Sequence, residues 1–157
     1  LAVAALNKKR FKKQNFKEFH PSGSLGAKLK TVEDLMTSGS KIPFINEDSN
    51  MRKALKLITE KKLGILIAIN KKKLTTGIIT DGQIRRSSQS NNLLIELSVK
   101  KVMTKNPISV DKDMLAEKGL AIMSEKKITS LCVHKKNSPK KTIGVLHIHN
   151  ILDGNVS

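Results

Sequence analysis

The spacing of apolar residues predicts a helix in the first half of the chain. Four of them recur at i, i+3, i+4 and i+7: Met51, Ala54, Leu55 and Ile58. This period places them on one helical face, with Asp48 or Ser49 as the cap and Gly64 at the end. Residues 42–45, before this helix, predict a short edge strand, because Pro43 cannot donate to a sheet ladder.

Two strands and a second helix are expected to follow. Residues 65–69 form a continuous apolar run, which predicts a buried strand, and residues 70–73 predict a turn. Residues 76–80 predict the next strand, and Asp81 can cap the helix after it. The polar segment 87–92 is expected to be a joint.

Three landmarks of this first unit return in the same order 65 to 67 residues later. They are Val32–Thr37 and Val99–Thr104, Glu60–Leu63 and Glu125–Ile128, and Gly77–Thr80 and Gly144–His147. Such self-similarity indicates a tandem duplication. We therefore expect two βαββα units of α/β (α+β) class, with function where the two copies meet.

The second copy is expected to repeat these elements. Its predicted strands and last helix are residues 107–110, 131–133, 143–146 and 148–152. Its long helix follows Asp111 or Asp113, and the predicted buried face is Leu115, Gly119, Ile122 and Met123. A short helix precedes each copy, capped by Thr31 and Ser98 respectively, and Gly39 ends the first.

Composition indicates a real but aromatic-poor core. Of 157 residues, 38% are hydrophobic and 3% aromatic, without Trp or Tyr, so the core must rest on Ile, Leu, Val and Met. A single cysteine, Cys132, forbids an internal disulfide and suits a reducing, cytoplasmic location. No apolar run reaches the length of a membrane span, and residues 1–6 are too short for a signal peptide. Because the chain begins with Leu1, we expect a fragment of a longer protein.

The formal net charge of +17 raises the question of a nucleic-acid partner. Only four of the 30 basic residues are arginine, and the only aromatic side chains of the Phe, Trp and Tyr class are four Phe. Base readout and base stacking rely on arginine forks and aromatic platforms. Composition therefore favours a solvated lysine surface, with no nucleic-acid and no membrane partner. A basic nucleic-acid module is the alternative, and it predicts a steep salt dependence of binding.

Two repeated motifs carry a resemblance to a known family. They are the Val-x-x-Leu/Val-Met-Thr segments at 32–37 and 99–104, and the Gly-Ile-Ile-Thr-Asp turn at 77–81. With the doubled βαββα order, these motifs make the chain from Lys30 onward similar to tandem cystathionine β-synthase (CBS) domains. The resemblance implies two repeats packed with pseudo-twofold symmetry, and adenosyl nucleotides or related ligands in the clefts between them.

The segment before the repeats is similar to part of an enzyme family. Residues 19–29, FHPSGSLGAKL, resemble the end of the sugar-isomerase (SIS) domain of D-arabinose 5-phosphate isomerases, which directly precedes a CBS pair. Ser22, Ser24 and Ala27 depart from the family's Gly, Ala and Arg. This family interconverts D-ribulose 5-phosphate and D-arabinose 5-phosphate for Kdo, and hence lipopolysaccharide, synthesis.

The resemblance divides the chain into three parts: residues 1–29 as the SIS tail, 30–92 as the first CBS domain and 93–157 as the second. It implies a sugar phosphate substrate at the missing SIS domain, no cofactor, and a homo-oligomer that is a tetramer in the parent protein. The chain alone is expected to be inactive. The alternative is a stand-alone CBS pair that senses a nucleotide or sugar nucleotide, and the sequence encoded before Leu1 would discriminate the two.

His20 is the candidate catalytic residue. Aldose–ketose isomerisation moves a proton between adjacent carbons, and an imidazole titrates near neutral pH. By the resemblance, His20 is the active-site histidine of the isomerase family; by its context alone, before Pro21, it is a loop residue. The Gly23-x-x-Gly26-x-Lys28 spacing lacks the Gly-Lys-Ser/Thr ending of a phosphate loop and predicts only a turn.

The resemblance places eight candidate ligand-binding residues at the cleft. They are Thr80, Asp81, Gln83, Arg85, Arg86, His147, His149 and Asn150. A hydroxyl and amides at a helix N-terminus can hold a phosphate, although a simple cap explains Asp81 equally well. Nucleotide-binding CBS domains usually carry a ribose-gripping Asp where this chain has Gln83 and Asn150, and an amide offers one acceptor oxygen. We therefore expect weak adenine-nucleotide binding, and pathway logic favours a sugar nucleotide such as CMP-Kdo, held by Arg85 and Arg86.

A metal site is not expected. His147 and His149 would share one face of a strand, but no Cys or carboxylate cluster in the sequence completes a site near them. Cys132 lies in an apolar run and is expected in the core.

Overall fold

The computed structural model describes residues 29–90 and 93–153 and shows two units of the same mixed α+β design. The first runs β2 (Phe44–Asn46), α4 (Met51–Lys61), β3 (Ile65–Ile69), β4 (Thr75–Thr80) and α5 (Asp81–Ser90). The second runs β6 (Ser109–Asp111), α7 (Ala116–Lys126), β7 (Ser130–His134), β8 (Thr142–His147) and α8 (Ile148–Asp153). In each unit the first strand is parallel to the second, and the second and third form an antiparallel hairpin. The predicted fold class is confirmed.

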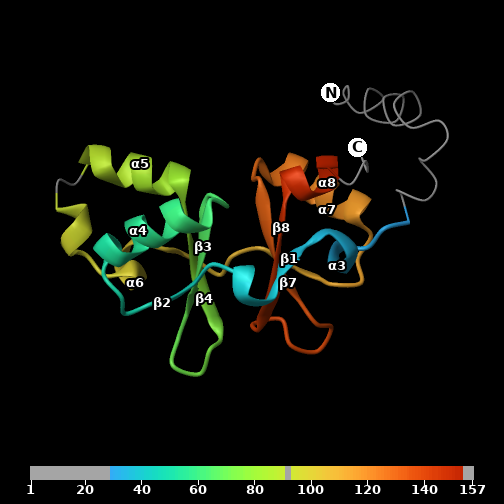
Figure 1. Cartoon of the computed structure of the whole chain (residues 1–157), viewed down its shortest axis with the longest axis horizontal. Helices are drawn as coiled ribbons and strands as arrows, with labels where there is room; N and C mark the ends of the chain where they lie inside the picture. The colour runs from blue at the N-terminus through green and yellow to red at the C-terminus, as the bar shows by residue number, and fades with distance from the viewer. Residues whose placement is uncertain (1–28, 91–92, 154–157) are drawn as a thin grey trace.

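A short arm before each unit packs on the other unit. The first arm is α3 (Val32–Leu35) and β1 (Thr37–Ser38), and the second is α6 (Val99–Val102) and β5 (Thr104–Lys105). β1 pairs with β8 and β5 pairs with β4, which gives the sheet orders β1-β8-β7-β6 and β2-β3-β4-β5 (Figure 1). These two-residue strands were not predicted. The domain limits 30–92 and 93–157 stay a prediction. They divide the chain by sequence position, whereas each arm packs on the unit from the other side of the division.

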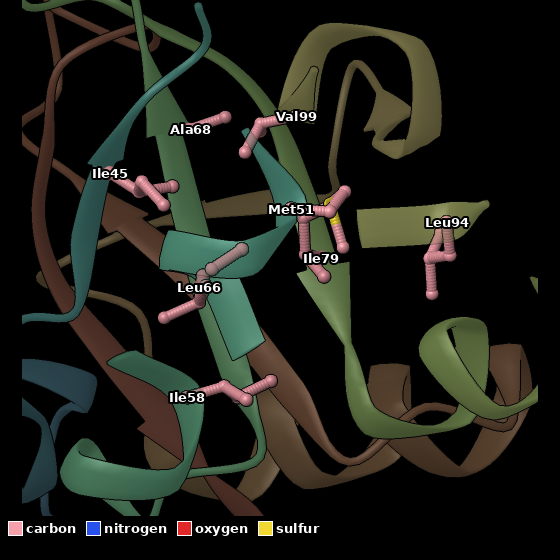
Figure 2. Packing of buried hydrophobic residues seen from close by; sticks show 9 residues of the cluster. Ile45, Met51, Ile58, Leu66, Ala68, Ile79, Leu94 and Val99 are labelled. Carbon is pink, nitrogen blue, oxygen red and sulfur yellow. The ribbon is translucent and has the colours of Figure 1, made fainter. Parts of the chain in front are cut away.

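Each unit has its own apolar cluster, and a third cluster joins the two. Figure 2 shows the first unit's cluster, with Ile45, Met51, Ile58, Leu66, Ala68, Ile79, Leu94 and Val99 labelled. The joining cluster consists of Ile42, Ile65, Ile67, Cys132 and Val145. The buried hydrophobic residues of the described ranges are all aliphatic, Met or Cys, so the aromatic-poor core is confirmed there. In the same ranges, no helix has the length and apolar character that crossing a bilayer requires.

The start of α4 differs from the prediction. Asn50 caps this helix, because its Oδ1 accepts from the Lys53 amide at 3.0 Å, and neither Asp48 nor Ser49 does so. The reason lies upstream, where Asn46 Oδ1 accepts from the Asp48 amide at 2.8 Å and folds a turn before the helix can begin. Three consecutive residues with capping chemistry made the sequence ambiguous.

The two arm helices are capped differently. Thr31 caps α3 as predicted, in a reciprocal box in which the Thr31 amide donates to Asp34 Oδ2 at 2.8 Å and the Asp34 amide donates to Thr31 Oγ1 at 3.3 Å. Ser98 makes no such side-chain bond at α6. Helix α3 also ends earlier than predicted, and Gly39 instead begins the 3-10 turn η1 (Gly39–Lys41).

Two other boundaries were predicted wrongly. Helix α5 extends to Ser90, so it includes most of the segment 87–92 that was expected to be a joint. Leu115 is the N-cap residue of α7 and is 37% exposed, whereas Ala116, Gly119 and Met123 form its buried face. Apolar spacing identified this helix but could not fix which apolar residue begins it.

Gly77 on β4 is a position where we expect an added methyl group to be costly. A Cβ there would lie 2.8 Å from the Thr104 carbonyl oxygen of β5 and 2.7 Å from Met103 Cγ. At the equivalent Gly144, the nearest atoms all belong to the Met36 side chain. We expect Gly77→Ala to lower the free energy of unfolding by about 1–3 kcal/mol. Gly144→Ala should cost less, because a methionine side chain can turn away and a paired backbone carbonyl cannot.

Urea unfolding of the two variants beside Gly82→Ala measures this difference. A Cβ at Gly82, within α5, meets only the ends of two flexible side chains, Arg86 Nη1 at 3.2 Å and Arg85 Nη2 at 3.8 Å. This control should therefore stabilise the protein by about 0.5–1 kcal/mol, the usual gain of Ala over Gly in a helix. A Gly77→Ala variant as stable as Gly144→Ala would show that β5 is not held against β4 in solution.

Candidate ligand-binding cleft

A cavity of about 490 Å³ lies between the two units, where α5 and α8 begin. Its polar lining comes from both units and includes Thr80, Asp81, Arg86, Lys127, Ser130 and His147. The two strand-to-helix turns, one after β4 and one after β8, therefore border the same space. The duplication explains this arrangement, since equivalent turns of the two copies meet across the joining cluster.

The first turn is built around Thr80. Its Oγ1 accepts from the Gln83 amide at 3.2 Å, and its amide donates to Gln83 Oε1 at 3.4 Å. Gln83 Nε2 donates to the Val102 carbonyl of α6, which ties the turn to the second arm. The Asp81 amide donates to the Gly64 carbonyl at 3.1 Å. Thr80, and not Asp81, is thus the cap of α5, and three amides of this turn already have partners.

The second turn follows a similar plan around His147. Its amide donates to Asn150 Oδ1 at 2.8 Å, and the Ile148 amide donates to the Thr129 carbonyl at 2.8 Å. The His149 amide donates to His147 Nδ1 at 3.0 Å, and the two imidazole rings stack with their centroids 4.9 Å apart. His147 Nδ1 is therefore an acceptor, which places the ring proton on Nε2.

Four of the eight predicted ligand-binding residues border the cavity: Thr80, Asp81, Arg86 and His147. The lining does not include the other four, Gln83, Arg85, His149 and Asn150. Gln83 and Asn150 direct their side-chain oxygens to backbone amides of their own turns, so those oxygens are committed within the protein. Both residues thus lie outside the cavity lining, and each side-chain oxygen already accepts one hydrogen bond from a backbone amide.

Sequence reasoning missed part of the cavity wall. Lys127 and Thr129 border it from the segment between α7 and β7, Ser130 from the first position of β7, and Asn106 and Pro107 from the approach to β6. The signal that could have found the first group is the repeated Glu-Lys-Lys-Leu/Ile landmark. It ends at the position where each copy turns from its long helix into its central strand.

The charge balance of the cavity is set by few groups. Burial, and to a smaller extent the nearby His149, lowers the pKa of His147, so this ring is neutral at pH 7. Positive charge at the lining then comes from Arg86 and Lys127, against the single carboxylate of Asp81. Together with the Thr80 hydroxyl, these groups suit a ligand that carries an anionic group such as a phosphate.

Cys132 separates the cavity from the core. Its side chain is 2% exposed, and burial raises the pKa of its thiol to about 12, partly opposed by a hydrogen bond from Thr142. This environment makes the thiol a packing group and a poor nucleophile at neutral pH. His20, the predicted catalytic residue, lies outside the described residues.

The model of the CBS domain family matches residues 32–90 and 99–156, and the chain belongs to this family. It is similar to the arabinose 5-phosphate isomerase KdsD of Francisella tularensis, with 36% identity over 154 residues, 97% of this chain and 46% of that protein. KdsD of Escherichia coli K12 is 36% identical over 157 residues, 99% of this chain and 47% of that protein. The uncharacterized protein RP505 of Rickettsia prowazekii is 34% identical over 94% of this chain and 44% of its own length. The chain therefore spans about half the length of these relatives.

Two solved structures share the fold of this chain. The protein in the structure of CBSX2 in complex with AMP is 25% identical to this chain. The match covers 78% of this chain and 93% of the CBSX2 chain, with a TM-score of 0.69. An uncharacterized conserved protein from Pyrococcus horikoshii is 21% identical, covers 83% and 95% respectively, and has a TM-score of 0.72.

Proposed function

We propose that this chain is the regulatory and oligomer-forming CBS part of a D-arabinose 5-phosphate isomerase. The observation that carries the proposal is the extent of the similarity. The Escherichia coli isomerase matches 99% of this chain, whereas the CBS model begins at residue 32. The likeness to isomerases thus continues into the segment before the repeats, where a CBS pair from an unrelated protein would have no reason to match.

In this proposal the longer protein is a cytoplasmic enzyme that interconverts D-ribulose 5-phosphate and D-arabinose 5-phosphate for Kdo and lipopolysaccharide synthesis. Its other half holds the sugar-isomerase domain, to which residues 1–29 belong as the tail. His20 reaches that active site, and the CBS pairs help to assemble the tetramer. The second candidate is a stand-alone CBS sensor, which the cationic cavity between the units favours.

The purified 157-residue chain should be folded and should not convert D-arabinose 5-phosphate, because a CBS pair offers no base at a bound sugar phosphate. The longer protein should convert it, as a colorimetric assay for the ketose product would show. Thermal unfolding of both proteins provides the control for folding. Turnover by the short chain would overturn the domain assignment, and a folded, inactive longer protein would favour the sensor.

The effector proposed for the cavity is a sugar nucleotide or nucleotide, with its phosphate near Arg86, Lys127 and the Thr80 hydroxyl. Adenine nucleotides should bind weakly, although CBSX2 is a CBS pair solved with AMP. The reason is the commitment of Gln83 Oε1 and Asn150 Oδ1 to backbone amides. An aspartate would have a second carboxylate oxygen left for a ribose hydroxyl.

Calorimetry with AMP tests this reasoning through the double variant Gln83→Asp, Asn150→Asp. A new charge-assisted hydrogen bond is worth about 1.5–3 kcal/mol, so AMP affinity should rise roughly ten- to hundredfold. Gln83→Asn with the native Asn150 is the matched control, since it shortens the side chain without adding a carboxylate. Micromolar AMP binding by the unmodified chain, or no gain in the double variant, would contradict the ribose argument.

A further inference from the structure

A second polar site lies between the two hairpin loops, and its cavity shares Asn106, Pro107 and Cys132 with the wall of the cleft. The β3–β4 and β7–β8 hairpins both point away from α5 and α8 (Figure 1). They are joined there, because the Thr75 amide donates to the Lys140 carbonyl at 2.7 Å and the Thr75 and Thr142 hydroxyls lie 2.5 Å apart. Thr75 begins β4 and Thr80 ends it, so about 17 Å of strand separates this end from the cleft.

The two hairpin loops concentrate positive charge without compensation. They carry seven exposed lysines: Lys71, Lys72, Lys73, Lys135, Lys136, Lys140 and Lys141. Residues 70–75 and 134–142 contain no Asp and no Glu. Within the described ranges, none of the seven lysines takes part in an ion pair. Seven like charges on two joined loops repel each other, and a bound polyanion would relieve that repulsion.

A cavity of about 280 Å³ opens between these hairpins. Its polar lining consists of Thr75, Asn106, Ser109, His134, Lys140 and Thr142. Ser109 Oγ and His134 Nδ1 lie 2.5 Å apart, so the His134 ring is held in place and its Nε2 is the remaining ring nitrogen for a ligand. The imidazole of His134, the amide of Asn106 and the ammonium group of Lys140 are donors of the kinds with which proteins hold phosphate oxygens.

We propose that this cavity and the seven lysines form a binding site for a small ligand with two or more linked phosphate groups. The cavity would take one phosphate, and the lysines of the two loops would pair with the next. A nucleic acid fits less well, because residues 70–75 and 134–142 contain neither Arg nor Phe for base readout or stacking. Because the first loop belongs to one unit and the second to the other, the ligand would clamp the two units together.

Calorimetry of the whole chain with inorganic triphosphate tests the proposal. The triple variant Lys71→Gln, Lys72→Gln, Lys140→Gln should bind triphosphate roughly tenfold more weakly, because each exposed charge pair contributes a few tenths to one kcal/mol. The control triple Lys53→Gln, Lys56→Gln, Lys118→Gln removes the same charge from exposed positions on α4 and α7. It should leave triphosphate affinity within about twofold of the parent.

Amide chemical shifts locate the bound triphosphate. Thr75 and Thr142 should shift on titration, and Thr80 and His147 at the other ends of the same strands should not. Four outcomes would overturn the proposal: no triphosphate binding, equal weakening in the two triple variants, shifts centred on the cleft, or tighter binding of a single-stranded oligonucleotide than of triphosphate. The result is independent of the isomerase assignment, which is tested by turnover.

Discussion

Replacing His20 with alanine in the longer protein should lower kcat by about 10²–10⁴-fold, the usual effect of removing one general acid–base group. Conversion of an aldose into a ketose transfers a proton between adjacent carbons and between their oxygens. That chemistry needs groups that both accept and release a proton near neutral pH, and histidine is the side chain whose ordinary pKa lies there. The proposal that residues 1–29 belong to the sugar-isomerase domain places His20 beside this reaction.

Two further variants separate a catalytic role from a structural one. His20→Asn retains a polar, hydrogen-bonding side chain but cannot carry the proton, so it should be as slow as His20→Ala. The exposed Lys53→Gln variant on α4 is the control. It changes the charge of the protein and should leave turnover unchanged. An unchanged kcat in His20→Ala, with intact oligomers, would remove this residue from the catalytic list. A kcat restored in His20→Asn would instead make His20 a positioning residue.

The elements with a strong local signal could be predicted from the sequence. Helix α4 carries an apolar stripe at helical spacing, and β3 is a continuous apolar run, so both were placed within a few residues. The arms could not be placed in the same way. Strands β1 and β5 are each two residues long. Strand β1 precedes the first unit and pairs with β8 of the second, whereas β5 precedes the second unit and pairs with β4 of the first. This pairing depends on how the two units pack together, and no periodic pattern of apolar residues in the sequence indicates it.

The candidate site was only partly predictable for a related reason. Thr80 and His147 stood out because both end a repeated Gly-containing strand. Lys127 lies in the connection between α7 and β7 and Ser130 begins β7, and only the packed fold shows that both reach the same cavity. The sequence also could not show that Gln83 and Asn150 turn inward, since an amide can either cap a turn or contact a ligand.

Cys132 should react with iodoacetamide on the order of 10³-fold more slowly in the native chain than in the chain unfolded in urea at pH 8. Its pKa is raised to about 12 by burial, whereas an unperturbed cysteine has a pKa near 8.5. The thiolate is the nucleophile, so the thiolate fraction sets the rate. At pH 8 that fraction is roughly one in four in the unfolded chain and about one in 10⁴ in the folded one.

The same pKa shift predicts how stability depends on pH. The unfolded state loses the thiol proton as pH rises through about 8.5, and the folded state keeps it until about pH 12. Ionisation therefore favours the unfolded state, and stability should fall as pH rises above about 8.5. Cys132→Ala removes this group and should show a smaller fall between pH 8 and 10, as urea unfolding at each pH would measure. Native labelling within a few-fold of the unfolded rate, or identical pH profiles for the two proteins, would show that the thiol is not sealed between the cavity and the joining cluster.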